Sequence, residues 1–198
     1  MRISRSRAGW AVATVAALTL VAGCGGTDGS SGEHGTRTTA GPSSADHNQA
    51  DITFAQKMIV HHRQALEMAA MAESRAADSK VRSVAAGIER AQDPEIDQMT
   101  AWLREWEAPV PSVGGHDGHA DMPGMMSNHD MAALAGASGA DFDRMFLDMM
   151  IRHHEGAIEM ARIQQQEGRN PAAKALAERI AADQAAEIEQ LRALLDAK

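Results

Sequence analysis

The chain has 198 residues, with 44% hydrophobic and only 3% aromatic residues, and a formal net charge of −8. This acidic balance disfavours nucleic acids and anionic surfaces as partners and is compatible with cations. The chain has one cysteine, so intrachain disulfides are excluded. Beyond the N-terminal segments about 150 residues remain, a length that suits one domain with a single core.

An export signal is predicted at residues 1–23. Three arginines precede an apolar run at residues 8–22 that is too short to span a membrane as a helix. The following "VAGC" resembles a bacterial lipobox, which implies cleavage before Cys24 and lipidation of its sulfur, so that no thiolate remains as a metal ligand. An ordinary signal peptide with a chance cysteine is the alternative. Cleavage removes three of the 19 basic and none of the 27 acidic residues, which changes the net charge from −8 to −11.

Residues 24–46 are rich in Gly, Ser and Thr and predict a flexible tether. No later apolar run is long enough to cross a membrane. We therefore expect a lipoprotein on the outer face of the cytoplasmic membrane, whose domain, residues 47–198, is attached through the lipid alone.

Four helices are predicted in this domain, at residues 49–76, 79–106, 139–168 and 171–196. Ala, Leu, Met, Glu, Gln and Arg dominate these segments. Asn48 and Ser138 are predicted N-caps, each followed three residues later by an acid, and Asp78 and Asn170 cap the second helix of each pair. Pro94 is expected to bend the second helix without ending it.

The helices form two copies of one hairpin. Residues 51–103 align with residues 143–195 without a gap, with 18 identities in 53 positions. An ungapped repeat indicates that both halves share one geometry. The sequence therefore predicts an all-α, up-down four-helix bundle made of two hairpins related by a pseudo-twofold axis.

Each copy carries two adjacent histidines after a methionine, in "MIVHH" and "MIRHH". Helical spacing places all of them on or beside the core-facing stripe. The second helix of each hairpin brings a Gln and a Glu to the same depth, so that four imidazoles, two thioethers and two carboxylates could line one region. The candidate metal ligands are Met58, His61, His62, Met150, His153 and His154, with Gln92, Glu95, Gln184, Glu187 and Met149 as further ligands or hydrogen-bond partners.

A structural polar layer is the alternative, in which Gln and Glu satisfy buried imidazoles that fix the helix register. Four histidines at one depth in an acidic protein favour metal binding, because imidazole is a common neutral ligand and needs a hydrogen-bond acceptor behind it. Adjacent histidines diverge by about 100° on a helix, so both members of a pair are not expected to bind one ion. Which member faces the metal stays open.

The predicted linker, residues 107–138, is rich in His and Met. Its segment "HDGHADMPGMMSNHDM" contains three histidines and four methionines in 16 residues. Such a tract suggests metal capture, and thioether with imidazole suits Cu(I), whereas imidazole with carboxylate suits Cu(II) or zinc. A solvated linker without a metal role is equally compatible. The candidate linker ligands are His116, His119, Met122, Met125, Met126 and His129.

These segments resemble a bacterial family. The two "MI.HH..A.EMA" motifs, the linker "MPGMMS", the stretch "SGADFDRMFLDMMIRHHEGAIEMA" and the "Q..EI.Q" elements of the second and fourth helices are similar to the domain of unknown function 305 family, over about residues 47–196. The resemblance implies a ferritin-like architecture, export, and copper-binding relatives linked to copper tolerance. It implicates Met58 and Met150 with the four histidines. Met149 stands where the first half has Lys57, so a Met-rich site is expected to be stronger in the second half.

The leading hypothesis is copper binding and sequestration, with copper as Cu(I) or Cu(II) and with zinc or iron ranked below it. A second copy of the chain or a copper-transfer partner is compatible with it. A ferritin-like di-metal oxidase or redox enzyme ranks second, because such bundles use Glu-x-x-His motifs that these helices lack. A non-catalytic structural or interaction lipoprotein with core histidines is the third hypothesis. No catalytic residue is assigned.

Overall fold

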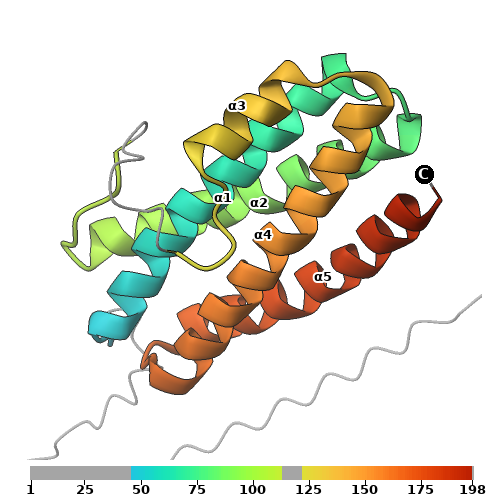
Figure 1. The fold of residues 1–198 in the computed structure, drawn as a ribbon. Coiled ribbons are helices and arrows are strands. Elements are labelled where there is room, and N and C mark those ends of the chain that lie inside the picture. The colour runs from blue at the N-terminus through green and yellow to red at the C-terminus, as the bar shows by residue number, and fades with distance from the viewer. Residues whose placement is uncertain (1–45, 113–121, 198) are drawn as a thin grey trace, which may run out of the picture. The chain divides into compact units, whose positions relative to one another are not determined.

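Five helices follow one another in the computed structural model of the chain, which describes residues 46–112 and 122–197. They are α1 (Gln49–Arg75), α2 (Ser79–Glu105), α3 (Asn128–Gly136), α4 (Gly139–Glu167) and α5 (Pro171–Asp196) (Figure 1). The four predicted helices are confirmed to within about one residue at each end. Helix α3 was not predicted and lies in the segment interpreted as linker. Among the described residues, none of the helices combines the length and apolarity that a membrane span requires.

The four predicted N-cap residues all occupy the N-cap positions of their helices, and three of them make the side-chain capping hydrogen bond. Asn48 and Asp51 form a capping box, in which the Asn48 side chain accepts from the Asp51 backbone N–H at 3.1 Å and the Asp51 carboxylate accepts from the Asn48 N–H at 2.8 Å. Asp78 accepts from the first turn of α2, and Asn170 accepts from two backbone N–H groups of α5. Pro94 lies inside α2, which continues through it as predicted.

Ser138 is the N-cap of α4, as predicted, but it lacks the expected capping box. It has the extended backbone of a cap, but its side chain makes no capping hydrogen bond. The next residue, Gly139, has a φ of 65°, so the chain turns into α4 through a left-handed conformation that redirects the cap. The acid of the expected capping box, Asp141, forms an exposed ion pair with Arg144 instead.

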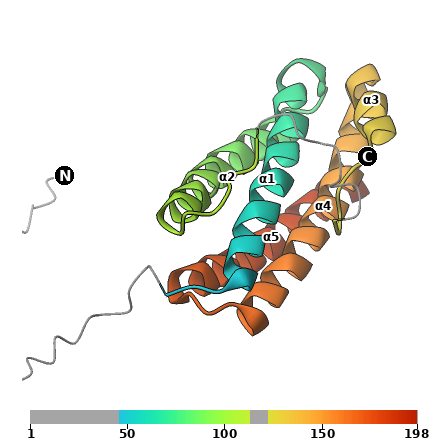
Figure 2. The same ribbon diagram turned by 90° about the vertical axis from the view of Figure 1, so that its left-hand side faces the viewer.

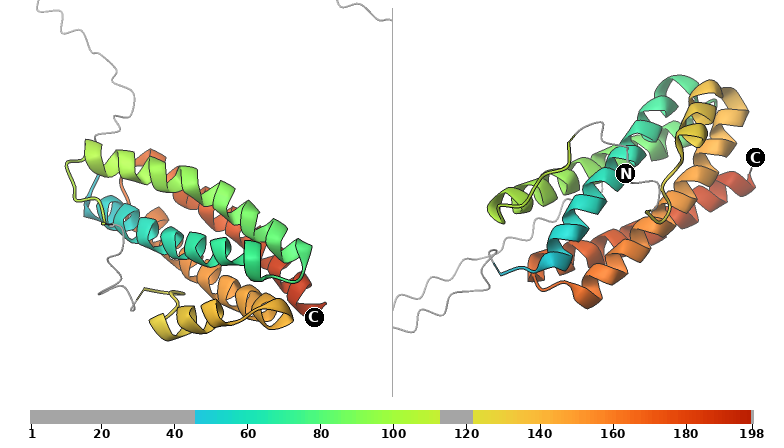
Figure 3. Two further views of the ribbon diagram at one scale, coloured as in Figure 1. Left: turned by 90° about the horizontal axis from the view of Figure 1, so that it is seen from above. Right: turned by 60° about the vertical axis from the view of Figure 1, so that its left-hand side comes forward.

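The helices assemble as two hairpins. Helix α1 packs on α2, α4 packs on α5, and the hairpins meet mainly through α1 and α4. Figure 2 shows α1 between α2 and α4, and Figure 3 shows α3 lying along the outer side of the α1 and α4 pair. The predicted all-α bundle of two repeated hairpins is therefore confirmed, with α3 as an addition.

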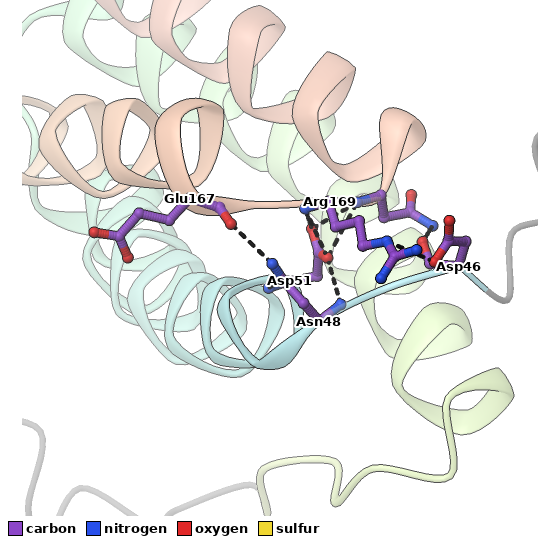
Figure 4. Close-up of polar contacts among 6 residues, drawn as sticks. Asp46, Asn48, Asp51, Glu167 and Arg169 are labelled. Atoms are coloured by element: carbon purple, nitrogen blue, oxygen red, sulfur yellow. Dashed lines mark hydrogen bonds and ion pairs between the residues drawn. The ribbon is translucent and has the colours of Figure 1, made fainter.

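Two carboxylates at equivalent positions of the repeat hold the hairpins together. The buried Asp51 of α1 accepts hydrogen bonds from the backbone N–H groups of Arg169, at 3.0 Å, and Asn170, at 3.1 Å, in the turn between α4 and α5 (Figure 4). The buried Asp143 of α4 accepts from two backbone N–H groups in the turn between α1 and α2, each at 3.1 Å. Each hairpin thus caps the turn of the other, which fixes the register of α1 against α4.

The apolar core is divided into two clusters. One contains buried residues from segment 65–72 of α1 and segment 142–151 of α4. The other contains buried residues from segment 54–60 of α1 and segment 157–161 of α4. The two histidine pairs occupy the positions between these segments on both helices. The fold therefore places a polar layer, defined as His61, His62, His153 and His154, between two apolar clusters where α1 meets α4.

Candidate metal site

The inner pair of the polar layer joins the two hairpins. His61 of α1 and His153 of α4 are both fully buried, and their ring centroids lie 3.7 Å apart with a tilt of 37°. The sequence repeat predicted that the hairpins would bring their histidines together, and the structure does so for these two residues. The contact is non-local, since it depends on how α1 packs on α4.

The outer pair of the layer faces the second helix of its own hairpin. His62 Nε2 lies 2.7 Å from Glu95 Oε2, and His154 Nε2 lies 2.7 Å from Glu187 Oε2. Both histidines are fully buried, whereas the carboxylates retain 19% and 23% of their side-chain exposure. The predicted depth of the two glutamates is thus borne out, and the two hairpins carry the same hydrogen bond.

The two glutamines predicted at this depth are buried but do not bind the histidines. Neither side-chain polar atom of Gln92 has a hydrogen-bond partner, and Oε1 of Gln184 has none either. Their side chains are 2% and 4% exposed. They therefore add unpaired polar atoms to the interior, which is costly unless another group satisfies them.

Burial keeps the inner histidines neutral. Burial first and the neighbouring His62 second lower the pKa of His61 from 6.5 to about 3, although the hydrogen bond with the Pro123 carbonyl acts in the opposite direction. Burial, followed by His61 and His154, holds the pKa of His153 well below 6.5. Both imidazoles are therefore neutral at pH 7, which is the form that binds a metal ion.

The hydrogen bonds of the layer leave nitrogen lone pairs unused. A carboxylate accepts, so Nε2 of His62 and of His154 donates a proton to its glutamate. Nδ1 of His61, His62 and His154 has no hydrogen-bond partner, and neither ring nitrogen of His153 has a partner of normal geometry. Unprotonated, buried and unpaired imidazole nitrogens are what a metal site requires of its ligands.

The predicted thioether ligands flank the layer from opposite sides. Met58 belongs to one apolar cluster and Met150 to the other, and both are fully buried. Each precedes its two histidines by three and four residues on the same helix, the spacing at which helical side chains are neighbours. Met149 is also buried, whereas its counterpart Lys57 is exposed.

Part of the predicted linker is packed into the core instead of being solvated. Met122 and Met126 are 7% and 5% exposed and belong to the two apolar clusters, so these methionines fill the core. Met125 is half-buried, and His129 is exposed on α3. His116, His119 and Cys24 lie outside the described residues, as do the signal peptide and all of the tether except its last residue.

Sequence reasoning missed two participants in the layer. The backbone carbonyl of Pro123 lies 3.0 Å from Nε2 of His61, and Gln64 holds the backbone of Met126. The sequence contains one indication of this arrangement. Gln64 aligns with Gly156 in the repeat, so the two copies differ close to histidines that are the same in both.

The donor set limits how an ion could be held. Within residues 46–112 and 122–197, no three His, Cys, Asp or Glu side chains are arranged as a group that could hold a metal ion. Two imidazoles with a thioether sulfur would form a soft donor set, which is the kind that suits Cu(I).

A family profile and several solved structures are similar to this chain. The profile described as "Domain of unknown function (DUF305)" matches residues 51–195. A DUF305 fragment from Deinococcus radiodurans is 34% identical with a TM-score of 0.69, and covers 76% of this chain and 98% of its own. A DUF305 protein from Streptomyces coelicolor that is assigned as secreted is 32% identical with a TM-score of 0.68, over 74% and 92%.

The protein CopM, in its Cu(II)-bound form, is 35% identical with a TM-score of 0.64, over 74% of this chain and 95% of its own. CopM in its Cu(I)-bound form is 33% identical with a TM-score of 0.60, over 72% and 92%, and an Ag-bound form also matches. No curated protein matches the chain. The profile match and these identities show that the chain belongs to the DUF305 family.

Proposed function

We propose that this chain binds copper in the polar layer and sequesters it outside the cytoplasm. One observation carries the proposal. Four fully buried imidazoles lie in one layer, the inner two neutral and in contact between the hairpins, and each of the four has a ring nitrogen without a hydrogen-bond partner. A purely structural layer would leave these nitrogens unsatisfied, at a cost of about 1–3 kcal/mol for each buried polar group.

The chemistry of the layer favours a soft monovalent cation. Imidazole nitrogen and thioether sulfur from Met58 and Met150 suit Cu(I), and neutral histidines do not oppose its charge. The carboxylates of Glu95 and Glu187 stand behind the outer histidines and supply compensating negative charge. Support also comes from CopM, which has been crystallised with Cu(I), Cu(II) and Ag.

Export and lipid anchoring complete the proposal. The signal at residues 1–23 and the lipobox at Cys24 support attachment to the outer face of the cytoplasmic membrane. The secreted assignment of the Streptomyces coelicolor relative supports export. Mass spectrometry of the membrane fraction tests the anchor, since Cys24→Ala should release the protein from the membrane.

The copper proposal is tested by competition titration. Purified residues 25–198 are titrated with Cu(I) against a chelator, and His61→Ala/His153→Ala and His62→Ala/His154→Ala are compared with the wild type. Either double substitution should weaken binding by at least tenfold, as loss of a ligand or its orienting partner does. His47→Ala is the matched control, because His47 stacks on Trp106 outside the layer. Wild-type affinity in both double variants, with helical content unchanged by circular dichroism, would contradict the proposal.

A further inference from the structure

A short segment, Met122–Met126, crosses the polar layer and is called the strap here. Gln64 of α1 holds one end of it with two hydrogen bonds. The Met126 backbone N–H donates to Gln64 Oε1 at 2.7 Å, and Gln64 Nε2 donates to the Met126 carbonyl at 2.9 Å. The Gln64 side chain is buried, so no water replaces these bonds cheaply.

The strap rests on α4 where that helix has no side chain. A Cβ added at Gly156 would overlap the carbonyl of Pro123 and the Cα of Gly124. Gly124 itself has a φ of 75°, and a Cβ there would lie 2.6 Å from the carbonyl oxygen of Arg152. Two glycines therefore allow backbone to approach backbone, which is the usual reason for glycine at a close crossing.

This placement brings the Pro123 carbonyl to His61. The carbonyl oxygen lies 3.0 Å from Nε2, and since a carbonyl can only accept, Nε2 must carry the proton. In an imidazole with a single proton Nδ1 is then the nitrogen with the lone pair, and this atom is buried without a hydrogen-bond partner. The strap thus selects one of the two tautomers of His61.

The strap also breaks the symmetry of the repeat. Gln64 and Gly156 occupy equivalent positions of the two hairpins, so one helix grips the strap and the other makes room for it. As a result His61 has a hydrogen-bond partner at Nε2, whereas its counterpart His153 has none of normal geometry at either nitrogen. The two central histidines are chemically different, although the repeat that carries them is nearly exact around them.

We propose that the strap is a positioning element of the site, in which Gln64 and Gly156 hold the Pro123 carbonyl so that His61 keeps its Nδ1 lone pair free for a metal ion. The part that concerns the metal rests on the proposed function. The part that concerns the tautomer is a property of the metal-free protein. An experiment can therefore contradict the part on metal binding without contradicting the part on the tautomer.

The first test reads the tautomer by ¹⁵N NMR of the imidazole rings in metal-free protein near pH 7. Wild-type His61 should be a single tautomer protonated at Nε2. Gln64→Ala and Gly156→Ala displace the strap from opposite helices, and both should turn His61 into a mixture of the two tautomers. Gly87→Ala is the control, because its Cβ would meet only the end of the Arg90 side chain, at 3.9 Å, and His61 should stay unchanged.

The second test measures Ag(I) affinity of the same proteins by competition, since Ag(I) does not change oxidation state during the titration. Loss of a group that orients a metal-binding histidine costs about 10–100-fold in affinity, so both strap variants should bind Ag(I) at least tenfold more weakly, and Gly87→Ala should bind it as the wild type does.

Three results would overturn the inference. One is wild-type His61 protonated at Nδ1, which needs no variant to observe. Another is a single Nε2-protonated tautomer in both folded strap variants. The third is a tautomer mixture with unchanged Ag(I) affinity, which removes the role in metal binding. Wild-type protein that binds neither Ag(I) nor Cu(I) would refute the proposed function. The tautomer of His61 would still be decided by the NMR measurement on metal-free protein.

Discussion

The depressed pKa of His61 makes the metal-free protein sensitive to mild acid. In the unfolded chain this histidine titrates near pH 6.5, whereas in the folded protein burial lowers its pKa to about 3. Between these two values the unfolded state binds the proton and the folded state does not. The free energy of unfolding should therefore be fully retained above about pH 6.5 and should decrease as the pH falls toward 3.

The size of the effect follows from the two pKa values. A histidine with an unfolded pKa of 6.5 that stays neutral when folded destabilises the protein by about 2 kcal/mol at pH 5 relative to pH 8. Burial and the neighbouring His61 lower the pKa of His153 as well, so it acts in the same direction. A typical domain has only about 5–15 kcal/mol of stability in total, which makes this loss easy to measure.

Urea unfolding of metal-free protein, followed by circular dichroism at several pH values from 8 to 5, measures the effect. His61→Gln removes the titrating group and leaves an amide N–H that can still donate to the Pro123 carbonyl. This variant should lose about 2 kcal/mol less than the wild type between pH 8 and pH 5, whatever its stability at pH 8. Met68→Leu changes a buried side chain of the same helix without a titratable group, and should keep the wild-type pH dependence.

A wild-type protein whose stability is flat from pH 8 to pH 5 would refute this reasoning. So would a His61→Gln curve parallel to that of the wild type, because the pH dependence would then come from other groups. Copper should steepen the dependence, since protons compete with the metal for imidazole nitrogen.

Three further predictions concern the glutamates bound to the outer histidines, the aspartates that cap the hairpin turns, and the methionines beside the polar layer. Glu95→Ala and Glu187→Ala should each weaken Cu(I) binding about 10–100-fold in a competition titration, and by similar factors, because the two histidine–carboxylate distances are equal at 2.7 Å. An effect in only one of them would contradict the equivalence of the hairpins. Asp51→Ala should lower the free energy of unfolding in urea by about 3 kcal/mol, since it leaves the buried N–H of Asn170 and the partly buried N–H of Arg169 unpaired. Asp143→Ala should cost less, because both of its donors are only partly buried, and Arg169→Ala, which removes just the exposed ion pair with Asp46, should cost at most about 1 kcal/mol. Met58→Leu/Met150→Leu should weaken Cu(I) binding more than Zn(II) binding, because thioether sulfur is a soft ligand, and equal losses for both ions would argue against sulfur ligation.

The helices and the depth of the glutamates could be predicted because they depend on local pattern and on a repeat without gaps. Helix spacing places Met58, His61 and His62 on neighbouring positions, and counting residues from the turn places Glu95 at their level. The same count places Glu187 at the level of the second histidine pair, and the histidine–glutamate distances in the two hairpins are equal. Predicting these positions requires only the rise per residue of two antiparallel helices.

The strap and α3 could not be predicted for the opposite reason. Their positions depend on a glutamine 62 residues earlier in the chain and on the absence of a side chain at Gly156. The composition of the segment, rich in His and Met with Pro and Gly, resembles that of a solvated linker. The missing side-chain hydrogen bond of the N-cap Ser138 could not be predicted either, because the capping pattern alone does not reveal the positive φ of Gly139.

The two members of each histidine pair face different parts of the molecule. Adjacent side chains diverge by about 100° on a helix, so one member of each pair must point toward the other hairpin and the other toward its own. His61 and His153 take the first direction, and His62 and His154 take the second. The inner pair offers neutral nitrogens without competing protons, whereas the outer pair is joined to carboxylates. A cation buried between two apolar clusters is costly unless negative charge lies near it, and Glu95 and Glu187 are the groups that reach this layer with such charge while remaining partly hydrated. In the proposed site the two pairs would therefore have different roles, with the inner pair offering nitrogen lone pairs and the carboxylates behind the outer pair offering compensating charge.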